Sequence, residues 1–256
     1  MKVPFAQFSL LCLLLAAFNA GAGEVRIVTN AAGEHTLLRD AVPYTVRGAC
    51  CPVETTVGEL VAAGGNSVRT YGKEIERILP MARKYNLSIM LGLPIKRERD
   101  GFNYEDSAAV EAQFLEMREW VRRYRNEPNL LMWAIGNEPE LAARNTVPLW
   151  REVNRLARMI REEDSRHPII TVLAGFDERK IREVLKHCPE LDALGINDYG
   201  PAKDWPDELR RYGWIKPYLH TEFGPLGYWP GPHNRPPTAW GAAVEQTSSE
   251  KAELYA

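Results

Sequence analysis

The sequence predicts an α/β protein: a (β/α)8 barrel (TIM barrel) that is truncated before its eighth strand and preceded by a short β-hairpin. Two observations predict this fold. From Pro43 onward, seven short apolar runs alternate with amphipathic stretches, and no long polar linker separates them. No glycine-rich dinucleotide or phosphate loop follows any of these runs, which makes a doubly wound sheet the weaker alternative.

The first 22 residues have the pattern of a secretory signal peptide. Lys2 supplies a positive charge, residues 8–18 are almost wholly apolar, and residues 20–22 are small. Such a segment is too short to cross a bilayer as a helix. We therefore expect a mature chain that starts near Gly23 and is secreted or periplasmic, with no membrane attachment after cleavage. An uncleaved N-terminal anchor is the alternative.

Residues 23–42 are predicted to form the hairpin, since apolar residues alternate around the turn-like segment 30–33. Residues 43–256 then form the barrel domain. Its predicted strands are Tyr44–Ala49, Ser67–Tyr71, Ser88–Leu93, Leu130–Ile135, Ile169–Leu173, Ala193–Ile196 and Tyr218–Thr221. Its clearest amphipathic helices are Val110–Tyr124, Trp150–Glu163 and Glu178–His187. A closed barrel needs an eighth strand, and seven strands would leave two unpaired edges.

Length and charge exclude several classes of protein. The chain has 256 residues, with 45% hydrophobic and 26% charged content, which fits one large domain. A net charge of −2 gives no electrostatic reason to bind nucleic acid or an anionic membrane. Cys50, Cys51 and Cys188 remain after the signal, an odd number that gives no complete disulfide framework. We expect all three to be small buried hydrophobes.

Two glutamates are the strongest functional signal. Glu138 lies in Asn137-Glu138-Pro139 and Glu222 in Thr221-Glu222-Phe223, each at the C-terminal end of an apolar run. Carboxyl groups at the tips of two barrel strands are what glycoside cleavage requires, because one acid and one nucleophile must face the same bond. Either motif alone is weak evidence, since each also fits an ordinary strand end.

Four short motifs at successive strand ends together resemble a clan A glycoside hydrolase. They are Val68-Arg69-Thr70, Asn137-Glu138-Pro139, Asn197-Asp198-Tyr199 and Thr221-Glu222-Phe223-Gly224. The closest resemblance is to the barrel domains of glycoside hydrolase families 2 and 5, over residues 43–256. It implies a retaining mechanism, in which two carboxyl groups lie about 5–5.5 Å apart.

The resemblance also implies roles for individual residues. Glu138 would be the general acid/base and Glu222 the nucleophile, while Arg69 keeps Glu222 ionised. Tyr199 would donate a hydrogen bond to Glu222, and Asn137 would bind the sugar 2-hydroxyl. In such enzymes the eighth strand contributes an aromatic under the sugar. No residue here matches it, which puts the activity of this exact chain in doubt.

Several nearby residues have competing interpretations. Glu140 is the nearest rival to Glu138, although it follows Pro139 and lies in the loop. Strand alternation places Trp133 on the opposite face from Glu138, where it would pack against helices. The same alternation places His220 on the inward face with Glu222, to bind a sugar hydroxyl or to fill the barrel.

Substrate contacts are predicted from aromatic residues. Trp229 and Trp240 lie in a proline-rich loop after the seventh strand, and Tyr71 ends the second strand. Aromatic faces pack on the apolar faces of sugar rings. The alternative is a stiff loop that only covers the barrel mouth.

The sequence therefore predicts a secreted, retaining β-glycoside hydrolase that acts on an oligo- or polysaccharide, with β-glucan as the first candidate. No motif for a metal or cofactor is present, and we expect the reaction to need neither. A glucanosyltransferase with the same two glutamates is one alternative. A non-catalytic carbohydrate-binding barrel is the other.

Overall fold

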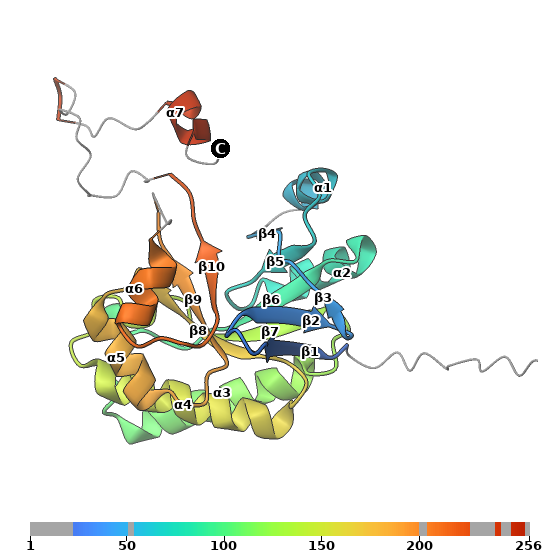
Figure 1. Ribbon diagram of the computed structural model, residues 1–256. Coiled ribbons are helices and arrows are strands. Elements are labelled where there is room, and N and C mark those ends of the chain that lie inside the picture. The colour runs from blue at the N-terminus through green and yellow to red at the C-terminus, as the bar shows by residue number, and fades with distance from the viewer. Residues whose placement is uncertain (1–22, 51–53, 200–203, 226–238, 242–246, 254–256) are drawn as a thin grey trace, which may run out of the picture.

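A seven-stranded parallel sheet, curled into an open barrel, forms the centre of the computed structural model (Figure 1). The structure describes residues 23–50, 54–199, 204–225, 239–241 and 247–253. The strands are β4 (Gly48–Ala49), β5 (Ser67–Arg69), β6 (Ser88–Leu93), β7 (Leu130–Ile135), β8 (Ile169–Ala174), β9 (Ala193–Asn197) and β10 (Tyr218–Glu222). Each strand pairs with the next one along the chain, so β4 and β10 are the edges of the described sheet. The predicted β/α barrel is confirmed.

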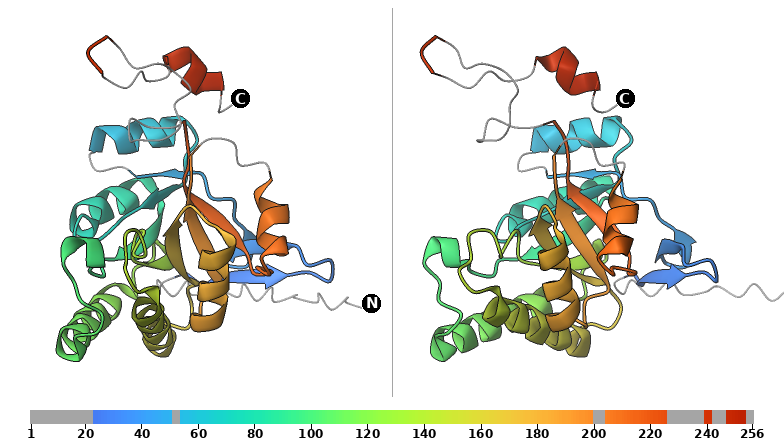
Figure 2. Two further views of the ribbon diagram at one scale, coloured as in Figure 1. Left: turned by 90° about the vertical axis from the view of Figure 1, so that its left-hand side faces the viewer. Right: turned by 60° about the vertical axis from the view of Figure 1, so that its left-hand side comes forward.

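Helices cover the outer face of the sheet, as Figure 2 shows for the middle of the chain. They are α1 (Glu54–Ala62), α2 (Ile75–Tyr85), α3 (Ser107–Tyr124), α4 (Thr146–Glu163), α5 (Glu178–His187) and α6 (Trp205–Arg211), with a 3-10 turn, η1 (Glu98–Asp100). A further helix, α7 (Ser248–Glu253), lies apart from the sheet in Figure 1 and has no buried residue. The first turns of α3, α4 and α5 are capped by Asp106, Asn145 and Asp177, whose side chains accept backbone N–H hydrogen bonds. None of the helices in the described part of the chain is long and apolar enough to span a membrane.

The main hydrophobic core lies between the sheet and these helices. Every residue of β6 and β7 is buried, because helices cover one face and the barrel interior the other. Trp133 packs in the outer core, as predicted, and its indole N–H donates to the Asp164 carboxylate at 2.9 Å. Val25, Met90, Leu131 and Val172 belong to a smaller cluster that fills the inside of the barrel.

An antiparallel sheet precedes the barrel and covers the N-terminal ends of its strands. It consists of β1 (Val25–Thr29), β2 (His35–Arg39) and β3 (Val42–Pro43). Val25 N–H donates to the Arg166 carbonyl just before β8, Arg39 to the Pro128 carbonyl before β7, and a ring nitrogen of His35 lies 3.1 Å from the Ile215 carbonyl before β10. The opposite, C-terminal ends of the barrel strands are left for the functional residues.

The predicted boundaries are confirmed to the residue for three elements. Strands β6 and β7 and helix α5 have the predicted limits. The predicted hairpin is present, but β3 adds a third strand to it. The predicted strand from Tyr44 is wrong over most of its length, since only Gly48–Ala49 pairs with β5. Tyr44 instead donates its hydroxyl to the Asn66 carbonyl at 2.9 Å. The predicted signal peptide, residues 1–22, lies outside the described residues.

The cysteine prediction holds for one residue and fails for another. Cys188 is buried, and burial raises the pKa of its thiol to about 12. Cys50 is exposed at the C-terminal end of β4, with its sulfur 3.1 Å from the Tyr71 hydroxyl. The β4 edge of the sheet has no paired neighbour among the described strands, which explains why Cys50 is not enclosed. Cys51 lies outside the described residues.

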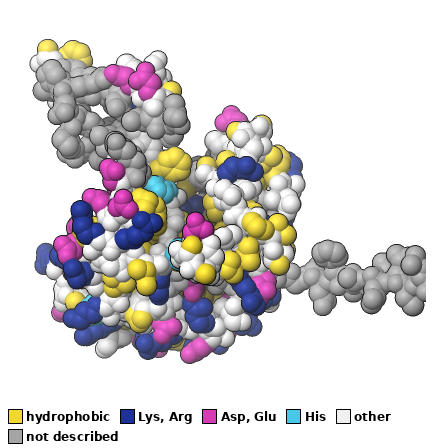
Figure 3. All heavy atoms as spheres, viewed as in Figure 1, with side chains coloured by type: hydrophobic (Ala, Val, Ile, Leu, Met, Phe, Trp, Pro, Cys, Tyr) yellow, Lys and Arg dark blue, Asp and Glu magenta, His cyan; other side chains and the backbone are white. Residues whose placement is uncertain are grey.

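Opposite charges alternate over the outer surface, as Figure 3 shows where blue and magenta side chains lie side by side. Most of these pairs are exposed, such as Arg182 with Glu178 at 2.7 Å on α5. Exposed pairs of this kind contribute little to stability, about 0.2–1 kcal/mol each.

Glu152 on α4 is a buried carboxylate with incomplete compensation. Its side chain is 4% exposed and pairs with Arg155 at 2.9 Å, while its second oxygen has no hydrogen-bond partner among the described residues. Burial raises the pKa of Glu152 to about 7, against the opposing effect of Arg155. The folded state therefore binds a proton more tightly than the unfolded chain.

We predict that Glu152→Gln stabilises the protein at pH 8 by roughly 1–3 kcal/mol and has little effect at pH 4.5. A carboxyl group with a raised folded-state pKa contributes stability below its unfolded pKa, and this contribution is lost as pH rises to about 7. Glutamine removes that loss. Denaturant unfolding of both proteins from pH 4.5 to pH 8 checks this, and parallel stability curves would contradict it.

Candidate active site

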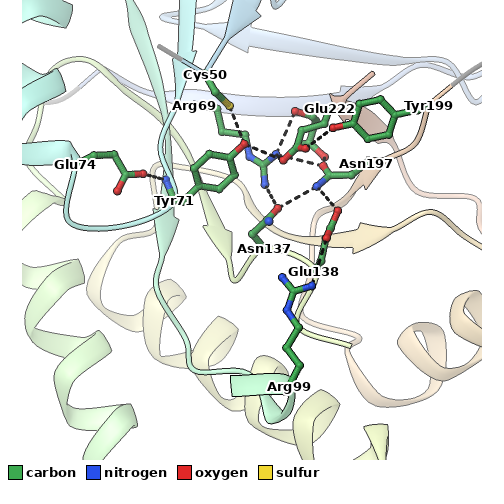
Figure 4. Close-up of polar contacts among 11 residues, drawn as sticks. Cys50, Arg69, Tyr71, Glu74, Arg99, Asn137, Glu138, Asn197, Tyr199 and Glu222 are labelled. Carbon is green, nitrogen blue, oxygen red and sulfur yellow. Dashed lines mark hydrogen bonds and ion pairs between the residues drawn. The ribbon is translucent and has the colours of Figure 1, made fainter. Parts of the chain in front are cut away.

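Glu138 and Glu222 come together at the C-terminal end of the barrel, in the polar cluster shown in Figure 4. Glu222 ends β10, and Glu138 follows β7 by three residues. Because all seven strands run parallel, their C-terminal ends meet at one rim of the barrel. The sheet therefore places two carboxylates from distant parts of the chain in one site.

Glu222 is held by three donors, and two of them reach one oxygen. Arg69, at the end of β5, donates from Nη1 to Oε1 at 2.8 Å, and the Tyr71 hydroxyl donates to the same oxygen at 2.8 Å. The Tyr199 hydroxyl donates to Oε2 at 2.7 Å. The Arg69 side chain is only 6% exposed, so little water screens its charge. All three donors stabilise the negative charge of Glu222.

Both tyrosines are kept in their protonated, donating form. Burial raises the pKa of Tyr71, and the contact with Cys50 adds to this shift against the opposing effect of Arg69. Burial also raises the pKa of Tyr199, together with its hydrogen bond to Glu222. Near neutral pH each hydroxyl therefore has a proton to donate to the carboxylate.

Glu138 has an unusual backbone conformation. Its φ is +49°, in the left-handed region that a residue with a Cβ rarely adopts. Gly136, two residues earlier, has φ +75° and packs closely against Ile95, which turns the chain sharply after β7. The Glu138 N–H donates to the Val172 carbonyl of β8 at 2.9 Å and fixes this turn. Backbone strain of this kind is common at functional sites.

Asn197, the last residue of β9, connects the two carboxylates. Its Nδ2 donates to Glu138 Oε1 at 2.9 Å, and its Oδ1 accepts from Arg69 Nη1 at 3.2 Å. Asn137 accepts from both of these residues, from Arg69 at 2.6 Å and from Asn197 at 3.0 Å. Asn197 was quoted in a sequence motif but given no role. Its position at a strand end was the signal that could have identified it.

Glu140, the rival to Glu138, lies in a different environment. It is 6% exposed, pairs with Lys180 of α5 at 3.0 Å and accepts the Ala174 N–H at 2.9 Å. Glu140 therefore anchors the loop after β7 to the end of β8 and to α5. The carboxylate that faces the Glu222 cluster is that of Glu138.

The prediction that His220 shares the inward face with Glu222 is wrong. Its ring stacks on Trp205 of α6, with the centroids 4.1 Å apart and the planes at 4°. The pairing of β10 with β9 is irregular between His220 and Glu222, so simple alternation fails there. Burial lowers the pKa of His220, which favours the neutral ring for stacking.

The predicted aromatic loop is only partly described. Trp229 lies outside the described residues. Trp240 is 81% exposed and is not among the residues around the two carboxylates in Figure 4. Tyr71, in contrast, is part of the site: it is 39% exposed, and the Arg69 guanidinium lies 4.7 Å from its ring centroid.

Besides Asn197, two further residues of the site had no predicted role. Cys50 contacts Tyr71, and Arg99 approaches Glu138, with Arg99 Nη1 4.0 Å from Glu138 Oε2. Arg99 lies in the charged stretch 96–100, which has the composition of an ordinary solvated loop. Its proximity to Glu138 depends on how η1 folds back toward β7, and no local sequence pattern indicates that. The described residues contain no group of three or more His, Cys, Asp or Glu side chains suited to a metal ion.

Solved structures of similar shape are glycosidases. A β-D-glucuronidase from Dictyoglomus thermophilum aligns with a TM-score of 0.60 and 21% identity, covering 79% of this chain and 39% of that one. A family 2 β-galacturonidase from Eisenbergiella tayi, bound to galacturonate, aligns with a TM-score of 0.59 and 20% identity, covering 79% and 38%. A Bacteroides uniformis β-glucuronidase gives 0.58 and 17%, covering 78% and 27%.

At these identities the solved structures establish the fold alone, and this chain spans well under half the length of each. No curated protein matches the chain in sequence. The family model for the TIM barrel domain of glycosyl hydrolases family 2 matches residues 88–246, which include Asn137, Glu138, Asn197 and Glu222. The match extends over more than half of the 256 residues. The chain therefore belongs to glycosyl hydrolases family 2, through its TIM barrel domain.

Proposed function

We propose that this protein hydrolyses β-linked glycosides by a retaining mechanism, with Glu222 as the nucleophile and Glu138 as the general acid/base. One observation carries the proposal. Glu138, just after β7, and Glu222, at the end of β10, are linked through Asn197 and Arg69, and of the two carboxylates Glu222 is the one that the Arg69 guanidinium binds. The two groups therefore have different surroundings, as two different roles require.

In the first step, a Glu222 oxygen attacks the anomeric carbon while the bond from that carbon to the leaving oxygen breaks. Glu138 gives its proton to the leaving oxygen, and a covalent glycosyl-enzyme forms. In the second step, Glu138 removes a proton from water, and the water oxygen attacks the anomeric carbon. The bond to Glu222 then breaks, and Glu222 leaves as a carboxylate.

The donors around Glu222 support the nucleophilic role. Arg69, Tyr71 and Tyr199 stabilise its charge before attack and again when it leaves. Glu138 lacks such a set of short hydrogen bonds: Asn197 donates to one oxygen at 2.9 Å, and Arg99 lies 4.0 Å from the other. Glu138 is thus better placed to exchange a proton.

The substrate is a further part of the proposal. β-Glucan was the first candidate from sequence. Similarity to solved structures named as β-glucuronidases and a β-galacturonidase is the reason to propose β-uronides as a second candidate. Sugar release from a panel of β-1,3-, β-1,4- and β-1,6-glucans, mannans and aryl β-glycosides, including glucuronides, tests both candidate substrates. Transfer of the sugar to an added acceptor in place of water would indicate a glycosyltransferring enzyme. Affinity without cleavage would indicate a carbohydrate-binding barrel.

We predict that Glu222→Ala lowers turnover of an aryl β-glycoside by about 10⁴-fold or more, because no nucleophile remains. Added azide should restore part of the rate by attacking from the vacated face and give a glycosyl azide of inverted configuration. Release of the aryl group and NMR of the product measure this. Glu178→Gln, an exposed change on α5, is the control for the loss of one carboxylate. Retention of full activity in Glu222→Ala would overturn the assignment.

We predict that Glu138→Ala impairs glycosides with poor leaving groups far more than those with good ones, by a difference of about 10²-fold or more. Only a poor leaving group needs a proton in the first step. The measurement is kcat/KM for a dinitrophenyl and an alkyl β-glycoside of the same sugar. An equal loss on both substrates would show that Glu138 is not the acid.

A further inference from the structure

Arg99 places a positive charge near Glu138 Oε2, whereas Asn197 donates to the other oxygen, Oε1. It comes from η1, the 3-10 turn after β6, and in Figure 4 its side chain extends from this turn toward Glu138. The distance from Arg99 Nη1 to Glu138 Oε2 is 4.0 Å, which is too long for a hydrogen bond. The Arg99 side chain is 27% exposed, and its guanidinium has no hydrogen-bond acceptor among the described residues.

Hydrogen bonds to neighbouring residues hold the turn that carries Arg99. Within the turn, Arg97 Nε donates to the Asp100 carboxylate at 2.7 Å, and Gly101 ends it with φ +92°. Across the site, the Glu98 carboxylate accepts the Arg144 N–H at 2.9 Å, which ties η1 to the loop that follows Glu138. The neighbouring charged groups thus hold the backbone of the turn, whereas the Arg99 guanidinium makes no hydrogen bond to the described residues.

Arg99 lies beside the residue proposed as the general acid, but its guanidinium is 4.0 Å from Glu138 Oε2 and makes no hydrogen bond to it. Arg99 is not needed to hold Glu222, which Arg69 already binds. An anion bound to the guanidinium would offset its charge beside Glu138. Carboxylates and sulfates suit this position, because guanidinium binds both through paired N–H groups.

We propose that Arg99 determines specificity by binding an anionic substituent of the substrate. This inference rests on the proposed hydrolase function and specifies its substrate class: a β-glycoside that carries a negatively charged group near the bond that is cleaved. The group is a carboxylate, as in a uronide, or a sulfate ester. This group would give the Arg99 guanidinium the hydrogen-bonded counter-ion that Glu138, at 4.0 Å, does not provide.

The test compares sugars that differ only at carbon 6. kcat/KM is measured for nitrophenyl β-glucuronide, β-glucoside 6-sulfate and β-glucoside with the wild-type protein and with Arg99→Gln. We expect the variant to lose about tenfold or more on the preferred charged substrate and to change little on the neutral glucoside. The charged substrate that suffers the loss identifies the group as carboxylate or sulfate. Arg99→Lys should recover part of the rate.

A matched control separates this effect from a general loss of positive charge. Arg182→Gln removes an exposed guanidinium on α5 that pairs with the surface residue Glu178 at 2.7 Å, and it should leave the ratio of charged to neutral substrate unchanged. An equal loss on all three substrates in Arg99→Gln would mean that Arg99 positions Glu138 and binds no substrate anion. An unchanged ratio would also overturn the proposal.

A binding measurement keeps the two proposals distinguishable. Calorimetry with methyl β-glucuronide, methyl β-glucoside 6-sulfate and methyl β-glucoside requires no cleavage. If the protein cleaves none of the aryl glycosides but Arg99→Gln weakens binding of a charged methyl glycoside by about tenfold, the hydrolase proposal fails and the anion site stands. If cleavage is normal and Arg99→Gln changes neither rates nor affinities, the anion site fails and the hydrolase proposal stands.

Discussion

The site depends on one buried guanidinium. Arg69 extends from β5 and binds Glu222 on β10, Asn137 after β7 and Asn197 on β9, with distances of 2.6–3.2 Å. A buried cation is costly unless it is paired, so this charge requires a carboxylate and amide oxygens around it. Four strand ends must therefore converge on Arg69. The same convergence brings Glu138 and Glu222 to one place.

The parallel barrel makes that convergence possible and also separates stability from chemistry. The N-terminal sheet covers the end of the barrel where the strands begin, and the inner cluster around Leu131 and Val172 fills its interior. The rim where strands end is left polar. At this rim, Glu138 has a strained backbone conformation with positive φ. The Glu140–Lys180 ion pair and the hydrogen bond from the Glu138 N–H to the Val172 carbonyl hold Glu138 in place. Buried polar contacts next to the site thus support a conformation that the local sequence does not favour.

The sequence predicts features that are set by local patterns, and it does not predict those that depend on contacts between distant residues. Strands β6 and β7 were predicted to the residue because burial on both faces leaves continuous apolar runs. Glu138 and Glu222 were predictable because strand ends place them. His220 was misplaced because an irregular pairing with β9 breaks the alternation, and no residue in Tyr218–Glu222 signals that irregularity. Asn197 was predictable in the same way as Glu138 and Glu222, since it ends β9. The position of Arg99 beside Glu138 depends on a contact across the site, which a linear pattern does not record.

Arg69 and Arg99 have identical side chains but differ in burial, and this difference suits them to different roles. Arg69 is 6% exposed and ion-paired at 2.8 Å, so moving it would leave Glu222 uncompensated. It is part of the fixed framework of the site. Arg99 is 27% exposed, lies 4.0 Å from Glu138 and makes no hydrogen bond to the described residues, so its guanidinium can move at little cost. A buried, paired cation maintains a site, whereas a half-exposed cation without a hydrogen bond is available to a ligand. This difference in surroundings supports the proposed roles, in which Arg69 holds Glu222 as the nucleophile and Arg99 binds the substrate.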